Sequence, residues 1–322
     1  MKFVTFCSSN EEKIGVFNSE TNSIYEINSL GLSKLYTDMN DFIENVSTGD
    51  LEKIKNNSFE NAKCYKLEEV KLCSPIVRPK KDIICLGLNY KDHVNEIPDG
   101  VIKNVVMPDY PIYFSKRADK IIGVDDKISL HGDLVEKLDY ESELAVIIGK
   151  EGINISKEDA YEYIFGYTIV NDISERALQD KHVQWFRGKS LDTHTSMGPC
   201  IVHKEEFEHP LKLDISSVVN GEVRQNSNTE YFIFDIPTII NDLSRGMTLK
   251  PGDIISTGTP AGVAMGMNPQ VYLKHGDIVE CKVEGIGVLK NIVDYWINMP
   301  YNFISTNNLI NIGLIKLMIN LL

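Results

Sequence analysis

The sequence predicts a β-rich α+β protein, in which a small N-terminal α+β domain precedes one larger domain. Most of the chain beyond residue 72 consists of short apolar runs bounded by Gly, Pro and Asp, which is the pattern of strands joined by turns. Signals for helices are few in the same stretch. The 322 residues are 43% hydrophobic, which is enough to bury one large core together with a small companion domain.

The N-terminal part combines strand and helix signals. Apolar residues at 2–6 and 14–17 predict two strands, and a helical segment follows them. The apolar residues at helical spacing in that segment are Leu35, Met39, Phe42, Ile43 and Val46.

Pro75 and Pro79 interrupt the chain among charged residues, which predicts a domain boundary at 72–80. We therefore expect a small domain at 1–70, a larger domain at 72–298 and a C-terminal tail at 299–322. The tail is mostly Ile, Leu, Met and Asn, and we expect a short helix packed on the body or on a partner subunit. Its apolar runs are too short to span a membrane, and no membrane attachment is expected.

Strands dominate the prediction for the larger domain. The apolar runs expected to form them are 83–88, 144–148, 167–170, 254–256 and 279–283. Ser156 and Asp159 resemble a capping box that starts a helical segment through residue 163. Asp235 and Pro237 open a second helix, which Gly246 closes.

Charge and cysteine content exclude several classes of protein. The 33 basic and 46 acidic side chains give a net charge of −13, and no basic stripe is present, so nucleic acid is not expected as a partner. The six cysteines form no CxxC pair and keep no zinc-like spacing to histidine. They indicate a reducing compartment, so we expect a cytoplasmic protein.

The candidate metal site is a set of carboxylates at strand ends. Glu141 and Glu143 are two residues apart beside a buried run, so they share one face of a strand. Asp172 ends another apolar run. Carboxylates of this kind suit Mg²⁺, Mn²⁺ or Ca²⁺. The alternative is an edge strand whose two glutamates face solvent.

A candidate proton-transfer pair follows the strand at 83–88. If residues 90–97 form a helical turn, His93 and Glu96 are neighbours on one face. A carboxylate on one imidazole nitrogen leaves the other nitrogen able to take a proton. The alternative is a solvated polar turn.

Two further segments carry candidate substrate-binding groups. Lys189 lies beside small residues and would neutralise a carboxylate or an enolate oxygen, unless it is an ordinary surface lysine. The glycine-rich turn at Thr257, Gly258 and Thr259 offers hydroxyl and backbone N–H groups for a carboxylate. No nucleotide-binding loop is present, so a nucleotide cofactor is not indicated.

The pocket that would select the rest of the substrate is expected at 97–118. Lys116 and Arg117 there would bind a distal carboxylate, which would favour a diacid, or they are solvated. Pro98, Asp99 and Gly100 mark a place where a closing segment could hinge.

Taken together and in this order, these segments resemble the fumarylacetoacetate hydrolase family over residues 72–293. The resemblance rests on seven segments of the chain: 89–96, 140–144, 166–179, 189–199, 220–222, 257–263 and 276–287. Within them, Val263-Ala264 departs from the Val-Gly that is more usual after the TGTP turn.

The resemblance implies a catalytic domain folded as a mixed β-sandwich roll and assembled as a homodimer. It implies that Glu141, Glu143 and Asp172 hold a divalent cation, with Mg²⁺ or Mn²⁺ expected and Ca²⁺ possible. It also implies that His93 and Glu96 act as a dyad in hydrolytic members, that Lys189 is the family lysine, and that Thr259 and Gln179 lie at the substrate.

The expected function is a metal-dependent hydrolase that cleaves a C–C bond of a 2,4-dioxo acid, with water activated by His93 and Glu96. The alternative is an isomerase, decarboxylase or tautomerase of 2-oxo or 2-hydroxydienoic diacids, which uses the same enolate without attack by water. A third alternative, outside enzymes, is an inactive metal-binding scaffold. In either enzyme the partner is a small 2-oxo acid.

Overall fold

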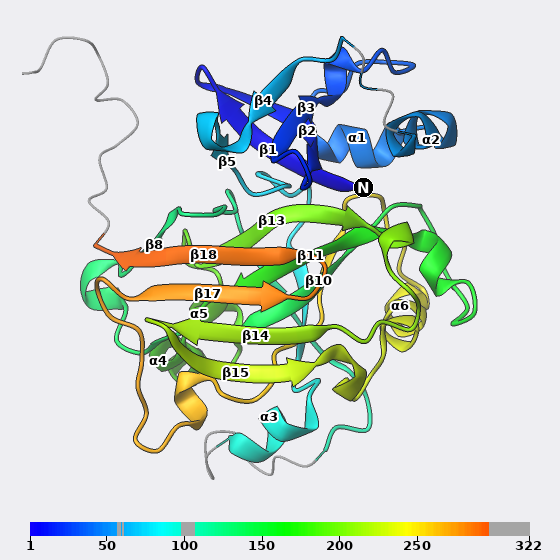
Figure 1. Ribbon diagram of the computed structural model, residues 1–322. Helices are drawn as coiled ribbons and strands as arrows, with labels where there is room; N and C mark the ends of the chain where they lie inside the picture. The colour runs from blue at the N-terminus through cyan, green and yellow to red at the C-terminus, as the bar shows by residue number, and fades with distance from the viewer. Residues whose placement is uncertain (57–58, 60, 98–106, 296–322) are drawn as a thin grey trace, which may run out of the picture.

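The computed structural model describes residues 1–56, 59, 61–97 and 107–295. The C-terminal tail at 299–322 and the expected hinge at Pro98, Asp99 and Gly100 therefore lie outside the described residues. Figure 1 shows an N-terminal module above a body made of two layers of strands.

The N-terminal module is an antiparallel sheet with two short helices beside it. Its elements are β1 (Lys2–Ser8), β2 (Glu11–Asn18), β3 (Ser23–Glu26), α1 (Met39–Asn45), α2 (Thr48–Lys55), β4 (Cys64–Lys66) and β5 (Lys71–Leu72). The predicted strands at 2–6 and 14–17 are confirmed by β1 and β2. The predicted helix starts later than expected, because the Asp38 side chain caps it by accepting from Asp41 N. Leu35 is consequently outside the helix and 73% exposed.

The first layer of the body continues the N-terminal sheet. Its strands are β6 (Ile83–Gly87), β7 (Ile112–Lys116), β10 (Ser142–Ile148), β11 (Ile164–Asp172), β13 (Thr195–His203) and β16 (Ile254–Ser256). The complete sheet has 11 strands in the order β4-β3-β2-β1-β13-β11-β10-β16-β6-β7, with β5 paired to β1. The junction is the pairing of β1 with β13, where Lys2 lies opposite Val202 and Phe3 opposite Ile201. The N-terminal module and the body therefore share one sheet.

The second layer is a five-stranded sheet in the order β15-β14-β17-β18-β8. Its strands are β8 (Lys127–Ser129), β14 (Asp214–Val219), β15 (Glu222–Asn228), β17 (Ile278–Val283) and β18 (Gly287–Asp294). One hydrophobic core joins the inner faces of the two sheets, and it includes Leu144 and Tyr167 from the first layer and Ile215 and Leu289 from the second. This is the expected mixed β-sandwich, since both sheets combine parallel and antiparallel pairs.

Helices in the body are few and short. They are α3 (Lys91–Glu96), α4 (Arg176–His182), α5 (Phe186–Lys189) and α6 (Ile236–Ser244). The predicted cap of α6 is confirmed, because the Asp235 side chain accepts from Thr238 N. Ser156 and Asp159 do pair with each other, but only a 3₁₀ turn at Ala160–Tyr163 follows them. Among the helices in the described ranges, none is both long and apolar enough to cross a membrane.

A two-stranded pairing of β9 (Leu138–Asp139) with β12 (Ser174–Glu175) lies where β10 begins and β11 ends. It places Asp139 opposite Ser174. This short pairing brings the start of α4 next to the acidic segment that leads into β10, and the candidate site is built around this junction.

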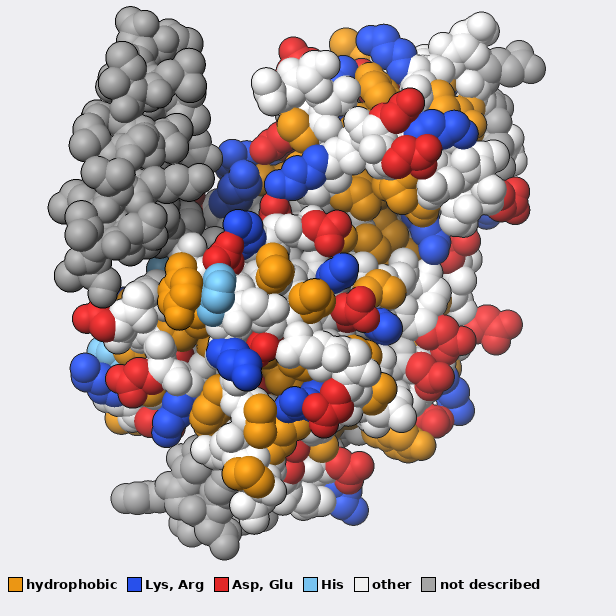
Figure 2. All heavy atoms as spheres, turned by 60° about the vertical axis from the view of Figure 1, so that its left-hand side comes forward, with side chains coloured by type: hydrophobic (Ala, Val, Ile, Leu, Met, Phe, Trp, Pro, Cys, Tyr) orange, Lys and Arg blue, Asp and Glu red, His pale blue; other side chains and the backbone are white. Residues whose placement is uncertain are grey.

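The outer surface carries charges of both signs. In Figure 2, acidic and basic side chains are interleaved over the visible face, with apolar side chains scattered between them. Exposed ion pairs such as Lys71–Asp126 and Lys127–Asp294 follow the same pattern. The charged groups of the candidate site differ from these, because they are buried.

Candidate active site

The structure brings the three predicted acids together. Glu141 directly precedes β10, Glu143 lies within it, and Asp172 ends the neighbouring antiparallel strand β11. Each of the three offers a carboxylate oxygen, and these atoms all lie within 4.8 Å of one another. All three side chains are buried. The alternative of a solvent-facing edge strand is therefore wrong, because β10 lies between β11 and β16 in the sheet.

Lys189, at the end of α5, connects two of these acids. Its ammonium lies 2.5 Å from Glu141 Oε2 and 2.7 Å from Asp172 Oδ2. It also lies 5.2 Å from the centre of the Phe114 ring. The predicted surface alternative for Lys189 is wrong, since the residue is 2% exposed.

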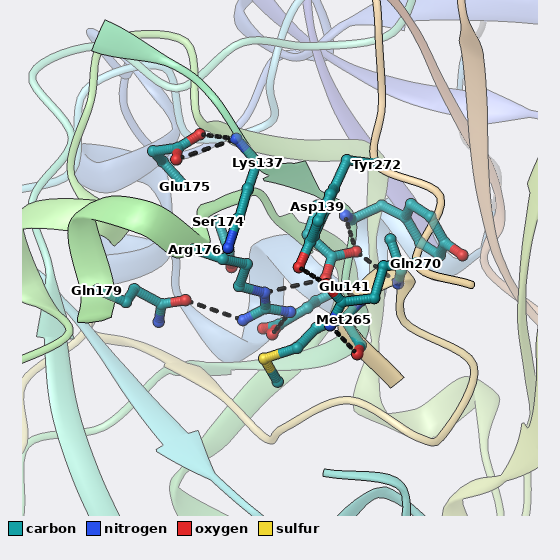
Figure 3. Close-up of polar contacts among 12 residues, drawn as sticks. Lys137, Asp139, Glu141, Ser174, Glu175, Arg176, Gln179, Met265, Gln270 and Tyr272 are labelled. Atoms are coloured by element: carbon teal, nitrogen blue, oxygen red, sulfur yellow. Dashed lines mark hydrogen bonds and ion pairs between the residues drawn. The ribbon is translucent and has the colours of Figure 1, made fainter. Parts of the chain in front are cut away.

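Arg176, the first residue of α4, is a second cation at the site (Figure 3). Its guanidinium lies 2.7 Å from Glu141 and 2.9 Å from Asp139, and it donates to Gln179 Oε1 at 3.0 Å. Because Gln179 accepts through its oxygen, its amide nitrogen keeps its donors for other partners. The carboxylate of Asp139 also accepts from the backbone N–H groups of Ala264 and Met265.

The acids respond to these cations differently. Burial raises the pKa of Glu141, but Lys189 and then Arg176 outweigh it and lower that pKa to about 2. Burial, followed by the Asp172 and Glu141 carboxylates, raises the pKa of Glu143 well above its ordinary value. Lys189 is itself opposed by burial, yet Asp172 and Glu141 raise its pKa to about 12. The neighbouring cations thus outweigh the effect of burial on the pKa of Glu141, but they do not outweigh it on the pKa of Glu143.

These residues fit a hard divalent cation. Among the described residues, Glu143 makes no ion pair and accepts only from Ser256 Oγ and Gly258 N. Asp172 Oδ1 is buried and accepts no hydrogen bond within the same part of the chain, although the Lys116 ammonium lies 2.7 Å from it. Three buried carboxylates, of which Glu143 has no cationic partner among the described residues, are the donor set that Mg²⁺, Mn²⁺ or Ca²⁺ prefers.

The predicted dyad is formed on α3. His93 Nδ1 lies 2.6 Å from Glu96 Oε1, and the second oxygen of Glu96 accepts from Gly262 N at 2.7 Å. Gly266 leaves room for this carboxylate, because a Cβ there would lie 2.5 Å from Glu96 Oε2. The alternative of a solvated turn is wrong, since His93 is 5% exposed.

The glycine-rich turn is tied to the acidic strand by Gln225 of β15. Gln225 accepts from Ser142 N and donates to Thr259 Oγ1 and Pro260 O. Thr259 in turn donates to Ser142 O at 3.0 Å. The turn is therefore held at a fixed distance from Glu143, and its Gly258 N–H donates to that glutamate at 3.1 Å.

A cavity of about 540 Å³ opens onto this cluster. The charged and polar residues that line it include Glu141, Glu143, Arg176, Gln179, Lys189, His93 and Thr259. The cavity therefore joins two of the three acids, both cations and His93 of the dyad in one space that can hold a small molecule.

The remaining predicted substrate-binding residues lie elsewhere. Lys116 is fully buried, with its ammonium on Asp172 and on Ile173 O, and it does not line the cavity. The Arg117 side chain is exposed, and it does not line the cavity either. Thr257 is buried and donates to Leu144 O. Whether these residues bind substrate stays a prediction.

The sequence patterns assigned no role to four residues of the site, namely Asp139, Arg176, Trp185 and Gln225. Asp139 continues the alternation of Glu141 and Glu143 by one more step, and that signal could have placed it on the same face. Arg176 lies in the segment 166–179 that carries the family resemblance, but no local pattern gives it a role, because its partner Asp139 is 37 residues away in sequence. Trp185 and Gln225 carry no local pattern that would assign them to the cavity or to the turn.

Comparison with known proteins identifies relatives of this arrangement. Residues 82–294 match the model of the fumarylacetoacetate (FAA) hydrolase C-terminal family. Oxaloacetate tautomerase YisK of Bacillus subtilis (strain 168) is 48% identical over 227 residues, which cover 70% of this chain and 74% of that protein. The mitochondrial oxaloacetate tautomerase fahd2 of Xenopus laevis is 38% identical over 297 residues, which cover 91% of this chain and 90% of that protein.

Solved structures agree on the fold. The fumarylacetoacetate hydrolase of Exiguobacterium antarcticum has a TM-score of 0.76 and 37% identity, and the match covers 92% of this chain and 100% of that one. Maleylpyruvate hydrolase of Sphingobium sp. SYK-6, in complex with manganese(II) and pyruvate, has a TM-score of 0.73 and 27% identity at the same coverage. Both sequence and fold therefore point to one group of enzymes.

Proposed function

The chain belongs to the fumarylacetoacetate hydrolase family, and from this premise we propose that it is a metal-dependent tautomerase of a 2-oxo diacid of the oxaloacetate type. Two relatives at 48% and 38% identity are oxaloacetate tautomerases. These relatives favour a tautomerase, which was the alternative predicted from the sequence, over the C–C hydrolase that was expected first.

The observation that carries the proposal is that Glu141 and Glu143 of the acid cluster line one cavity with His93 of the dyad. A divalent cation held by Glu141, Glu143 and Asp172 would supply a Lewis acid that stabilises negative charge developing on substrate oxygens. The bound manganese and pyruvate of the Sphingobium hydrolase support such a role for the cluster. Mg²⁺ or Mn²⁺ is the cation we propose.

The chain's own groups suit an anionic 2-oxo acid. Lys189 uses two of its three N–H donors on Glu141 and Asp172, so one remains for a ligand oxygen. The Gln179 amide nitrogen adds a further donor at the cavity wall. These donors would hold the carboxylate and the 2-oxygen in a buried, weakly screened environment.

His93 is the group proposed to move the proton. When Nδ1 donates to Glu96, the neutral imidazole carries its lone pair on Nε2. That nitrogen would take a proton from C3 of the keto form and return it to C3 of the enol. Glu96 keeps the ring in this tautomer, because Gly262 holds the carboxylate from its other side.

The test follows the ultraviolet absorbance of the oxaloacetate enol in the presence of Mg²⁺ or Mn²⁺. We expect the protein to accelerate its conversion to the keto form, and chelation of the metal to remove the acceleration. The variant Glu143→Gln should lose it as well. A purified, folded, metal-loaded protein that leaves the rate unchanged would refute the proposal.

A second candidate, hydrolysis of an acylpyruvate, is favoured by one observation, which is that His93, paired with Glu96, lines the same cavity. This pair suits the activation of a water molecule. Release of pyruvate from acylpyruvates would identify the hydrolase, and release of CO₂ from oxaloacetate would identify a decarboxylase. Metal binding without turnover of any 2-oxo acid would instead indicate the scaffold.

A further inference from the structure

The lining of the cavity is charged in one part and apolar in another. Its charged part carries Glu141, Glu143, the two cations and His93. The apolar lining includes Leu86, Ile112, Phe114, Val183 and Trp185, while Leu88, Ile97 and Met265 pack beside the dyad helix α3. A four-carbon diacid would engage only the charged part, whereas a cavity of about 540 Å³ is in the range that holds ligands of drug size.

Two aromatic rings form the part of the apolar lining next to the charged part. The Phe114 and Trp185 rings lie 5.3 Å apart at 79°, an edge-to-face contact. Trp185 lies directly on Gly87 at the end of β6, where a Cβ would be 2.3 Å from its ring. Because Lys189 lies 5.2 Å from the centre of the Phe114 ring, the aromatic wall begins where the acid-binding groups end.

The positions of the charges do not favour a second carboxylate at this wall. Among the described residues that line the cavity, the cations Arg176 and Lys189 both belong to the charged part. Asp180 adds a negative charge to the lining. Lys116 and Arg117, which the sequence offered for a distal carboxylate, do not line the cavity. An uncharged apolar group therefore fits this wall better than a carboxylate does.

We propose that the site also tautomerises pyruvates that carry an aromatic or bulky apolar group on C3, with that group against Phe114 and Trp185. The inference rests on the proposed tautomerase and extends its substrate class. In the reaction the C3–H bond breaks and its electron pair forms the C2=C3 double bond. His93 takes the C3 proton and returns it to solvent, while the 2-oxygen takes one proton from solvent, so no other reactant is needed.

Phenylpyruvate is the probe, and it is compared with oxaloacetate on the full chain in Mn²⁺. We expect acceleration of its enol–keto conversion, and competition by phenylpyruvate against oxaloacetate. The inference is overturned if oxaloacetate turns over while phenylpyruvate neither reacts nor competes. Turnover of phenylpyruvate alone would support the inference and refute the oxaloacetate proposal. Turnover of neither compound by folded, metal-loaded protein would refute both.

Variants of the aromatic wall test whether Trp185 is responsible for the turnover of phenylpyruvate. Trp185→Ala should lower kcat/KM for phenylpyruvate roughly tenfold or more, mainly through KM, because one large aromatic contact is lost. Its kcat/KM for oxaloacetate should fall less, so that the ratio of kcat/KM for phenylpyruvate to that for oxaloacetate drops at least about threefold. Phe186→Ala is the matched control, since Phe186 is the next residue, is 41% exposed and does not line the cavity. Equal losses on both substrates would overturn the role of the wall.

Discussion

The acid cluster and the His93–Glu96 pair both reach one cavity, through Glu141 and Glu143 and through His93, but they are held in different ways. The acids lie on interior strands, and three buried cations contact them from β7, α4 and α5. The dyad lies on a six-residue helix, and its anchor outside α3 is the bond from Gly262 N to Glu96. The cluster is therefore part of the folded core, whereas the dyad is a local attachment to it.

Because of this difference, variants of the cluster should lower both stability and activity, whereas variants of the dyad should lower activity alone. A change in the cluster leaves a buried charge without its partner, so it is expected to reduce the free energy of unfolding as well as activity. A change in the dyad alters the orientation of one imidazole and leaves the core intact. The following variants test this separation, from the largest expected effect to the smallest.

Arg176→Met should give the largest loss of stability. Removing the guanidinium leaves Asp139 and Glu141 buried with one cation fewer, and breaking a buried pair in this way costs about 3–5 kcal/mol. Denaturant unfolding measures the change. The control is Arg78→Met, because the Arg78–Glu12 pair is exposed, and its loss should cost less than about 1 kcal/mol. Equal effects for the two variants would contradict the buried cluster.

His93→Gln should lower kcat for tautomerisation about a hundredfold, the scale of a general acid–base contribution. Its free energy of unfolding should stay within about 1 kcal/mol of wild type. Steady-state kinetics and denaturant unfolding on the same preparation check both parts. His275→Gln, at a half-exposed surface position, is the control and should change neither quantity. Full activity in His93→Gln would remove the dyad from the mechanism.

Metal binding should stabilise the fold through the cluster and not through the dyad. Mn²⁺ at ten times its dissociation constant should raise the free energy of unfolding by about 1.4 kcal/mol. We expect the same shift in His93→Gln and none in Glu143→Gln. Glu151→Gln is the matched control, since Glu151 is exposed and pairs only distantly with Lys250, and it should keep the shift. A shift that persists in Glu143→Gln would contradict the proposed ligand set.

Gly266→Ala should have the smallest effect, confined to the dyad. The added methyl would lie 2.5 Å from Glu96 Oε2, so the carboxylate must move and the imidazole loses its support. We expect kcat to fall about tenfold and stability to change little. Gly49→Ala is the control, because its nearest neighbour would be 3.9 Å away, and it should leave kcat unchanged. A drop in stability without a drop in kcat would contradict this role.

The parts of the site that depend on local spacing could be predicted from the sequence. The i, i+3 spacing on a helical turn was sufficient to pair His93 with Glu96, and strand alternation was sufficient to place Glu141 beside Glu143. The position of Asp172 beside them came from the family resemblance. Five strands of the body, β6, β10, β11, β16 and β17, could likewise be found from their apolar runs, because each is buried in one of two packed sheets.

The other contacts of the site depend on pairings between segments that are distant in the sequence. Lys116 and Arg117 are adjacent on a strand end, so only one of them can turn inward, and the pairing of Lys116 with Ile83 decides which. Arg176 reaches Asp139 only because β9 pairs with β12. Trp185 reaches the cavity only because Gly87 leaves space for its ring. No sequence pattern within one segment predicts these contacts.

The pairing of β1 with β13 has a consequence for how the chain can be divided. β13 also pairs with β11, and Thr195 lies opposite Asp172, so the first strand of the protein is two strands away from the acid cluster. Deleting residues 1–70 would turn β13 into an open edge with Ile201 and Phe165 uncovered, a template for aggregation. The N-terminal module thus covers the edge of the sheet that carries the acid cluster, and the module and this sheet should unfold as one cooperative unit.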